Sequence, residues 1–157
     1  MTLQLLSFLL YFQVESFLTS IDSTQQLPQI ICTFSYTESR YKQDNVMQIS
    51  PILFEYKSRK YLWVRFLNMM FGYKSTNNKI ISYIIGITHI KFMIQLYNGN
   101  MRRVIKGWSK GMYSKVENED YKQKFEFFYK NVCKNNSESL KILSAHLMRN
   151  ETPKYEY

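Results

Sequence analysis

The sequence predicts an α+β domain in which helices pack on one face of an antiparallel sheet. Three observations predict this class. His89–Tyr97 alternates apolar and polar side chains, as a half-buried, central strand does. Asn98-Gly99-Asn100 follows, with residues that form a turn or cap a helix. The apolar residues after it recur at helical spacing, so the period changes from two to about 3.6 across this turn.

The first expected helix spans Met101–Tyr113. Its apolar stripe consists of Met101, Val104, Ile105, Trp108 and Met112. Because Trp108 belongs to this stripe, we expect it to pack in the core against the apolar side of the strand. Tyr97 and Arg103 lie where the strand meets the helix, and they are the candidate ligand-binding residues. Solvent exposure is the alternative explanation for both side chains.

The second expected helix spans Asn118–Val132. Its apolar stripe consists of Tyr121, Phe125, Phe128 and Val132. Ser114 with Glu117 has the spacing of a capping box, and Asn118 is an alternative cap. Glu119 and Asp120 suit the positive end of the helix dipole, so the dipole accounts for the acidic cluster at this helix start.

The preceding chain supplies candidate strands for the sheet. Ile30–Tyr36 has the β-branched and aromatic composition of a strand. Met47–Tyr56 contains a proline, which places it at a sheet edge or a strand start. Tyr61–Tyr73 is compatible with a strand pair or a helix, because its apolar residues are nearly continuous. Ile80–Ile87 leads into the central strand through a glycine that suits a bulge.

Length and composition indicate one packed domain, which we place at residues 30–157. A chain of 157 residues with 45% hydrophobic residues, 5 Gly and 3 Pro has the composition of a globular protein. It is long enough to bury roughly two thirds of its unfolded surface. The sequence carries no signal for the oligomeric state.

The amino terminus resembles a secretory leader. Leu3–Val14 is an apolar run of signal-peptide length, shorter than the ~20 residues that cross a bilayer. Residues 1–20 are therefore read as a signal peptide, which predicts a secreted or periplasmic protein. The run lacks a basic region before it, and a buried first helix in a cytoplasmic protein is the alternative.

Two sequence features depend on this localisation. In an oxidising compartment Cys32 and Cys133 could pair, although a separation of 101 residues specifies nothing by itself. Asn135-Asn136-Ser137 and Asn150-Glu151-Thr152 match the glycosylation pattern, which matters in a secreted eukaryotic chain.

The charge is unevenly distributed along the chain. Arg40–Tyr157 holds all 21 basic residues and 9 of the 12 acidic ones, which leaves that portion with a formal charge of +12. Such a field attracts nucleic acid, anionic membranes or acidic ligands, and salt weakens the attraction. The use of Lys as a solubilising residue in a Lys- and Asn-rich chain is the alternative explanation.

No catalytic or cofactor motif is present, so we expect a protein that is not an enzyme and carries no cofactor. His89 and His146 are the only histidines, and with two cysteines they make a poor metal set. The sequence has no glycine-rich phosphate loop and no nucleophile elbow.

The stretch Ile80–Leu143 resembles the chalcone isomerase-like family, in particular its bacterial, non-catalytic relatives. The likeness rests on residues that correspond to that family's helical segment, which are Trp108, Gly111, Tyr113, Glu117, Glu119, Lys124, Phe125 and Phe128. The preceding strand resembles the one that these proteins place before this helix. Ser139–Leu143 falls where their next strand begins.

This resemblance implies a binder rather than an enzyme. The plant enzymes carry an Asn where this chain has Arg103, and their active-site Tyr falls at Leu96. The family likeness therefore implies a cleft between sheet and helices that holds a fatty acid or another small apolar or acidic ligand.

Two other functions fit the sequence. A secreted helical signalling or interaction protein fits the leader, but the alternating strand argues against an all-helical chain. A basic protein that binds nucleic acid or a membrane surface fits the charge and the interleaved aromatic residues of Tyr121-Lys-Gln-Lys-Phe125.

Overall fold

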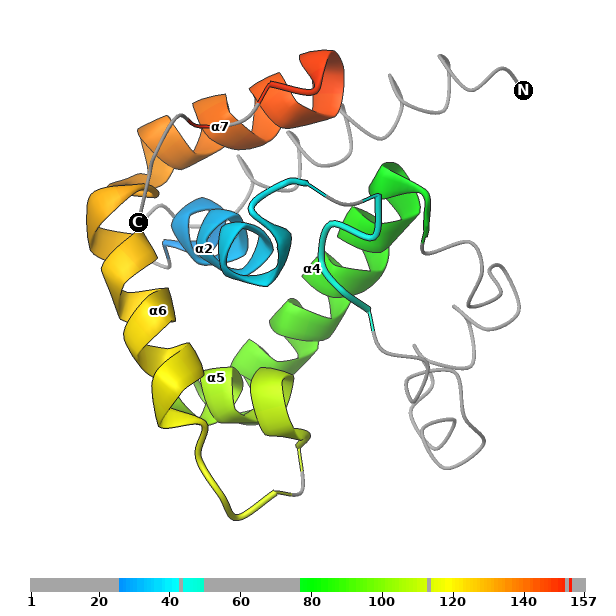
Figure 1. Ribbon diagram of the computed structural model, residues 1–157. Helices are drawn as coiled ribbons and strands as arrows, with labels where there is room; N and C mark the ends of the chain where they lie inside the picture. Colours follow the sequence, from blue (N-terminus) through cyan, green and yellow to red (C-terminus); the bar gives the residue numbers. More distant parts are fainter. Residues whose placement is uncertain (1–25, 43, 50–76, 113, 152, 154–157) are drawn as a thin grey trace.

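A computed structural model describes residues 26–42, 44–49, 77–112, 114–151 and 153 of the chain, which form helices and connecting turns with no strand among them (Figure 1). The helices are α2 (Leu27–Ser39), α4 (Lys79–Leu96), α5 (Met101–Lys110), α6 (Glu119–Asn131) and α7 (Asn136–Arg149). The described part of the chain is therefore all-helical, and the predicted α+β class with an antiparallel sheet is wrong.

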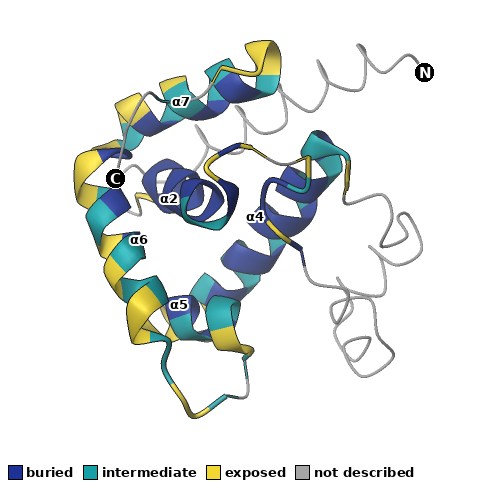
Figure 2. Cartoon of the chain, viewed as in Figure 1, coloured by how far each residue is buried: buried dark blue, intermediate teal, exposed yellow. Residues whose placement is uncertain are grey.

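Helix α2 lies at the centre, with α4, α5, α6 and α7 arranged around it (Figure 1). Every residue from Leu27 to Tyr36 is buried, so α2 is covered on all sides (Figure 2). Helices α6 and α7 both pack directly against it. A helix that is apolar all round is typical of such a central position.

Burial explains why Ile30–Tyr36, predicted as a strand, is part of α2. A fully covered helix needs β-branched and aromatic side chains on every face, which is the composition that also favours a strand. The hydroxyls of Thr33 and Ser35 find acceptors within the helix itself. The hydroxyl of Thr33 donates to the carbonyl of Gln29 at 2.6 Å, and that of Ser35 donates to the carbonyl of Ile31 at 3.0 Å.

The predicted central strand His89–Tyr97 and the segment Ile80–Ile87 both lie in α4. The buried face of this helix holds Gly86, His89, Ile90 and Met93, which recur at helical spacing. Leu96, expected on the apolar side of the strand, is 49% exposed. The alternation over nine residues was thus coincidental, because a helix packed on several sides carries apolar residues outside one stripe.

Among the described helices, α4 is the one whose length and apolar composition would allow it to cross a membrane. Half of this span is buried inside the fold, as it is in the core helix of a globular domain.

Asparagine side chains cap four of the helices. Asn78, Asn100, Asn118 and Asn135 each accept hydrogen bonds from backbone N–H groups in the first turn of the following helix, α4, α5, α6 and α7 respectively. These bonds satisfy N–H groups that have no partner within the helix. Of the two caps considered for α6, Asn118 is the one used. Glu119 and Asp120 lie in its first turn, as predicted.

The two expected helices after the turn are confirmed as α5 and α6. Helix α5 begins at the predicted residue and ends three residues earlier than predicted, and each end of α6 differs by one residue. Helix α5 stops at Lys110 because Gly111 adopts a φ of 97°. Within α6, Phe125 and Phe128 are buried, and Val132 is buried just beyond its end.

The fold expected from the chalcone isomerase-like resemblance is wrong, because that fold contains a sheet and the described residues form helices and turns only. Ser139–Leu143, expected to begin a strand, lies within α7. The described residues form no sheet against which a ligand cleft of that family could form. Tyr61–Tyr73 and the predicted leader lie outside the described residues, as does most of Met47–Tyr56.

Candidate functional site

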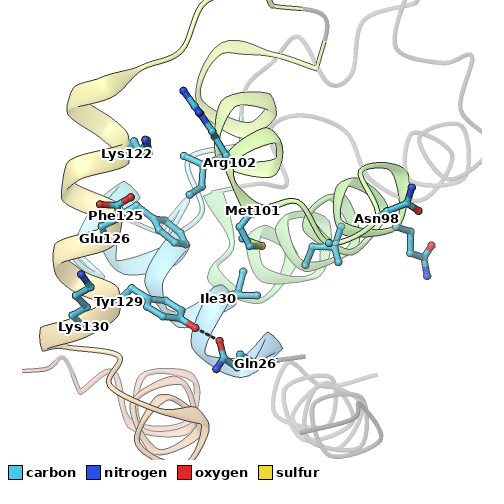
Figure 3. Close-up of a pocket in the computed structure, with 14 residues that line it drawn as sticks. Gln26, Ile30, Asn98, Met101, Arg102, Lys122, Phe125, Glu126, Tyr129 and Lys130 are labelled. Carbon is cyan, nitrogen blue, oxygen red and sulfur yellow. Dashed lines mark hydrogen bonds between the residues drawn. The ribbon is translucent and has the colours of Figure 1, made fainter. Parts of the chain in front are cut away.

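A pocket of about 890 Å³ opens between the start of α2, the turn from α4 to α5, and one face of α6 (Figure 3). Its volume lies within the range of roughly 300–1,000 Å³ that is common for small-molecule sites. The pocket is the candidate functional site because apolar side chains form its walls and charged side chains lie among them.

Helix α6 supplies one wall through helical spacing. Its lining residues are Lys122, Phe125, Glu126, Tyr129 and Lys130. They lie three, four, seven and eight positions apart from the first, so they occupy one face of the helix. This face therefore presents the rings of Phe125 and Tyr129 to the pocket, together with the charged side chains of Lys122, Glu126 and Lys130.

The opposite wall comes from the turn between α4 and α5. Asn98 and Gly99 adopt φ values of 51° and 78°, a left-handed conformation that asparagine and glycine tolerate. The turn reverses the chain and places Ile94, at the end of α4, in the same pocket as Met101 and Ile105 of α5. Ile30 of α2 completes the apolar lining.

Charge around the pocket is predominantly positive. Arg102, Lys122 and Lys130 line it together with a single carboxylate, Glu126. Arg102 is also held by Glu117, which lies outside the pocket, through a pair of bonds of 2.6 and 3.0 Å. The hydrogen bond from Arg102 lowers the pKa of Glu117, and the same contact raises the pKa of Arg102.

One end of the pocket is closed by a hydrogen bond between α6 and the start of α2. The hydroxyl of Tyr129 donates to the side-chain oxygen of Gln26, and Figure 3 shows both groups at this end. Arg102 and Lys122 lie toward the other end in the same view. Lys130 lies at the Tyr129 end in the same view, so cationic side chains stand at both ends of the pocket.

The structure brings the two sequence-predicted site residues together, but neither lines this pocket. Arg103 lies with its guanidinium carbon 4.7 Å from the centre of the Tyr97 ring, which is a cation–π contact. Tyr97 is buried, and its hydroxyl donates to the carbonyl of Met112 at 3.2 Å. Their neighbours Asn98 and Arg102 are the residues that reach the pocket.

Sequence reasoning missed a half-buried carboxylate that joins three helices. Glu38 of α2 accepts a hydrogen bond from the indole nitrogen of Trp108, and another from the hydroxyl of Tyr121 at 2.6 Å. Burial raises the pKa of Glu38, and these two bonds oppose that rise. A lone Glu near the end of a helix carries no sequence signal for such partners. Trp108 packs against the core as expected, with its ring 5.3 Å from that of Phe34.

Both histidines are held in the core instead of the pocket. The Nδ1 atom of His146 lies 2.9 Å from the hydroxyl of Tyr83, and the imidazole stacks on the ring of Tyr41 at 4.3 Å. Burial lowers the pKa of His89 and of His146 to about 4. Within the described residues no group of His, Cys, Asp and Glu side chains is arranged to hold a metal ion.

Comparison of this chain with protein-family models, with curated proteins and with solved structures finds no significant match.

Proposed function

We propose that the protein binds an anionic amphipathic small molecule, such as a long-chain fatty acid, and is not an enzyme. The observation that carries this proposal is the combination of apolar walls with three cationic side chains in one pocket. Apolar contact favours the body of such a ligand, and the cations favour its acidic head. The expectation of a small apolar or acidic ligand is thus retained, without the family resemblance that first suggested it.

The side chains that line the pocket support binding better than chemistry. The described lining residues include no His, Cys or Ser, and in this proposal the ionisable side chains that do line the pocket, Glu126, Tyr129 and the three cations, serve binding. The buried Tyr83 and His146 contact one another rather than the pocket. Catalytic groups would need to meet the ligand, and these side chains are placed elsewhere.

The test is equilibrium binding of a fluorescent long-chain fatty acid to the full chain. We expect saturable binding to one site, and weaker binding of the alcohol of equal chain length because it lacks the charge. Lys122→Gln combined with Lys130→Gln should weaken binding of the acid roughly tenfold, which corresponds to about 1.4 kcal/mol. The alcohol should bind this variant as it binds the wild type.

A matched control removes two lysine charges from positions outside the pocket. Lys110 and Lys134 are exposed and do not line the pocket, so Lys110→Gln with Lys134→Gln should leave affinity unchanged. Equal weakening by both double variants would mean that net charge, not the pocket, attracts the ligand. Arg103→Ala tests the sequence-predicted site separately, since this residue lies outside the pocket lining.

A second candidate function is that of a helical interaction or signalling protein. The absence of any strand among the described residues favours it, because a strand was the feature that argued against this class. Saturable binding of the labelled chain to intact cells, displaced by unlabelled chain, would support it. Displacement by heparin alone would instead point to the basic charge.

A further inference from the structure

The two cysteines, far apart in sequence, meet in the core. Cys32 lies in the middle of α2, and Cys133 lies just after the end of α6. Both side chains are fully buried, and the Cys32 thiol is the largest influence on the pKa of Cys133. The hydroxyl of Tyr41 also donates to the sulfur of Cys32 at 3.6 Å. The structure holds both residues as free thiols.

Hydrogen bonds on either side of Cys133 fix its position against α2. The side-chain nitrogen of Gln29 donates to the carbonyl of Tyr129 at 3.2 Å, before the cysteine. The backbone nitrogen of Gln29 donates to the side-chain oxygen of Asn136 at 3.3 Å, after it. The backbone nitrogen of Cys133 donates to the carbonyl of Phe128 at 2.9 Å. Gln29 and Cys32 are three residues apart on one face of α2, so these bonds hold the segment that carries Cys133 against the face that carries Cys32.

We propose that Cys32 and Cys133 form an intramolecular disulfide when the chain folds in an oxidising environment, which links α2 covalently to the connection between α6 and α7. The chain contains 2 cysteines in all, so no other intramolecular pairing exists. This inference is independent of the proposed ligand.

The reaction is thiol–disulfide exchange with a small disulfide such as oxidised glutathione. One cysteine thiolate attacks a sulfur of the oxidant, the oxidant's S–S bond breaks, and one glutathione leaves as its thiolate. The second cysteine thiolate then attacks the protein sulfur of this mixed disulfide, and the second glutathione leaves. Two protons pass from the cysteines to the two glutathione molecules, and the two cysteines are oxidised while the reagent is reduced.

Burial determines when this reaction can take place. The neighbouring Cys32 thiol and the loss of water together raise the pKa of the Cys133 thiol well above its ordinary value. The attacking species is the thiolate, so thiols of the folded chain react slowly. The bond therefore forms while the chain folds, and a chain folded in the reduced state resists later oxidation.

The experiment refolds the full chain from denaturant in a buffer of reduced and oxidised glutathione, and in parallel with excess reductant. Denaturation in iodoacetamide followed by mass spectrometry then counts the free thiols. We expect none after oxidative refolding and two after reductive refolding. Trypsin digestion without reductant should join the peptide Asn131–Lys134 to the peptide that ends at Arg40, since no Lys or Arg precedes that residue.

Thermal unfolding supplies a second readout. The oxidised monomer should melt roughly 10 °C above the reduced one, as expected for closing a long loop. Cys32→Ala and Cys133→Ala each leave one thiol, and neither should show this difference between the two buffers. Two alkylated thiols after oxidative refolding, or glutathione adducts and dimers in place of the internal bond, would overturn the proposal.

Discussion

Glu38 and Trp108 are joined by a hydrogen bond from the indole nitrogen to the carboxylate, which ties the end of α2 to α5. Tyr121 of α6 donates to the same oxygen atom. One half-buried carboxylate thus connects three of the helices that bound the pocket.

Truncating Trp108 tests this connection. Trp108→Ala should lower the free energy of unfolding by about 3–5 kcal/mol, because it removes a large ring from the core and one donor from Glu38. Trp108→Phe keeps a ring but not the donor and should cost about 1–3 kcal/mol. Urea denaturation measures both changes. A Trp108→Ala variant as stable as the wild type would remove the packing role.

The half-buried carboxylate of Glu38 should make stability depend on pH. Burial raises the pKa of Glu38 above 4.5, so the folded chain holds this proton more tightly than the unfolded chain does. The resulting stabilisation is fully present below the unfolded pKa and is lost as the pH rises through the folded pKa. Glu38→Gln cannot ionise, so it should gain stability relative to the wild type as the pH rises from 4.5 through the folded pKa of Glu38. Parallel pH profiles for the two proteins would contradict this assignment.

The two histidines should make the free energy of unfolding fall as the pH falls, which is opposite to the effect of Glu38. Burial lowers the pKa of His89 to about 4, so the stability it contributes is present above its unfolded pKa and is lost as the pH falls. Between pH 6.5 and 5 this loss amounts to about 2 kcal/mol. In a Glu38→Gln background, adding His89→Phe should flatten this part of the profile. If the slope is unaffected, His89 is not buried in its neutral form.

A pair of glycines tests the packing around α4 and α5. A Cβ added at Gly86 would lie 2.7 Å from Cγ of Met47, near the base of that side chain. Gly86→Ala should therefore cost about 1–3 kcal/mol despite the higher helix propensity of alanine. At Gly107 the contact is with the sulfur of Met93 at 2.9 Å, in a flexible side chain. Gly107→Ala should be milder, and an equal loss at both positions would count against this packing.

Filling the pocket should block the proposed ligand without unfolding the chain. Ile94 lines the pocket at the end of α4, and Ile94→Trp places a larger ring in its space. We expect at least a tenfold loss of fatty-acid affinity, about 1.4 kcal/mol, measured by fluorescence titration. Leu96 is exposed on the same helix outside the pocket, so Leu96→Trp is the matched control. Retained binding in Ile94→Trp would place the ligand elsewhere.

Local signals in the sequence determined the turn and the two helices that follow it. Asn100 and Asn118 act as caps through their own side chains, and Gly111 ends α5 through its own backbone freedom. Such features depend on residues within one or two turns of the chain, so sequence reasoning reaches them. The apolar stripe of α6 was predictable for the same reason.

Tertiary packing decided that the segments of α2 and α4 form helices and not strands. Ile30–Tyr36 and His89–Tyr97 have strand-like composition or alternation, but partners on several sides make these segments helical, and burial overrides a short pattern. The pocket, the link from Glu38 to Trp108 and the meeting of Cys32 with Cys133 likewise join residues that are distant along the chain. A single sequence carries no signal for such contacts, because they depend on how the helices pack around α2.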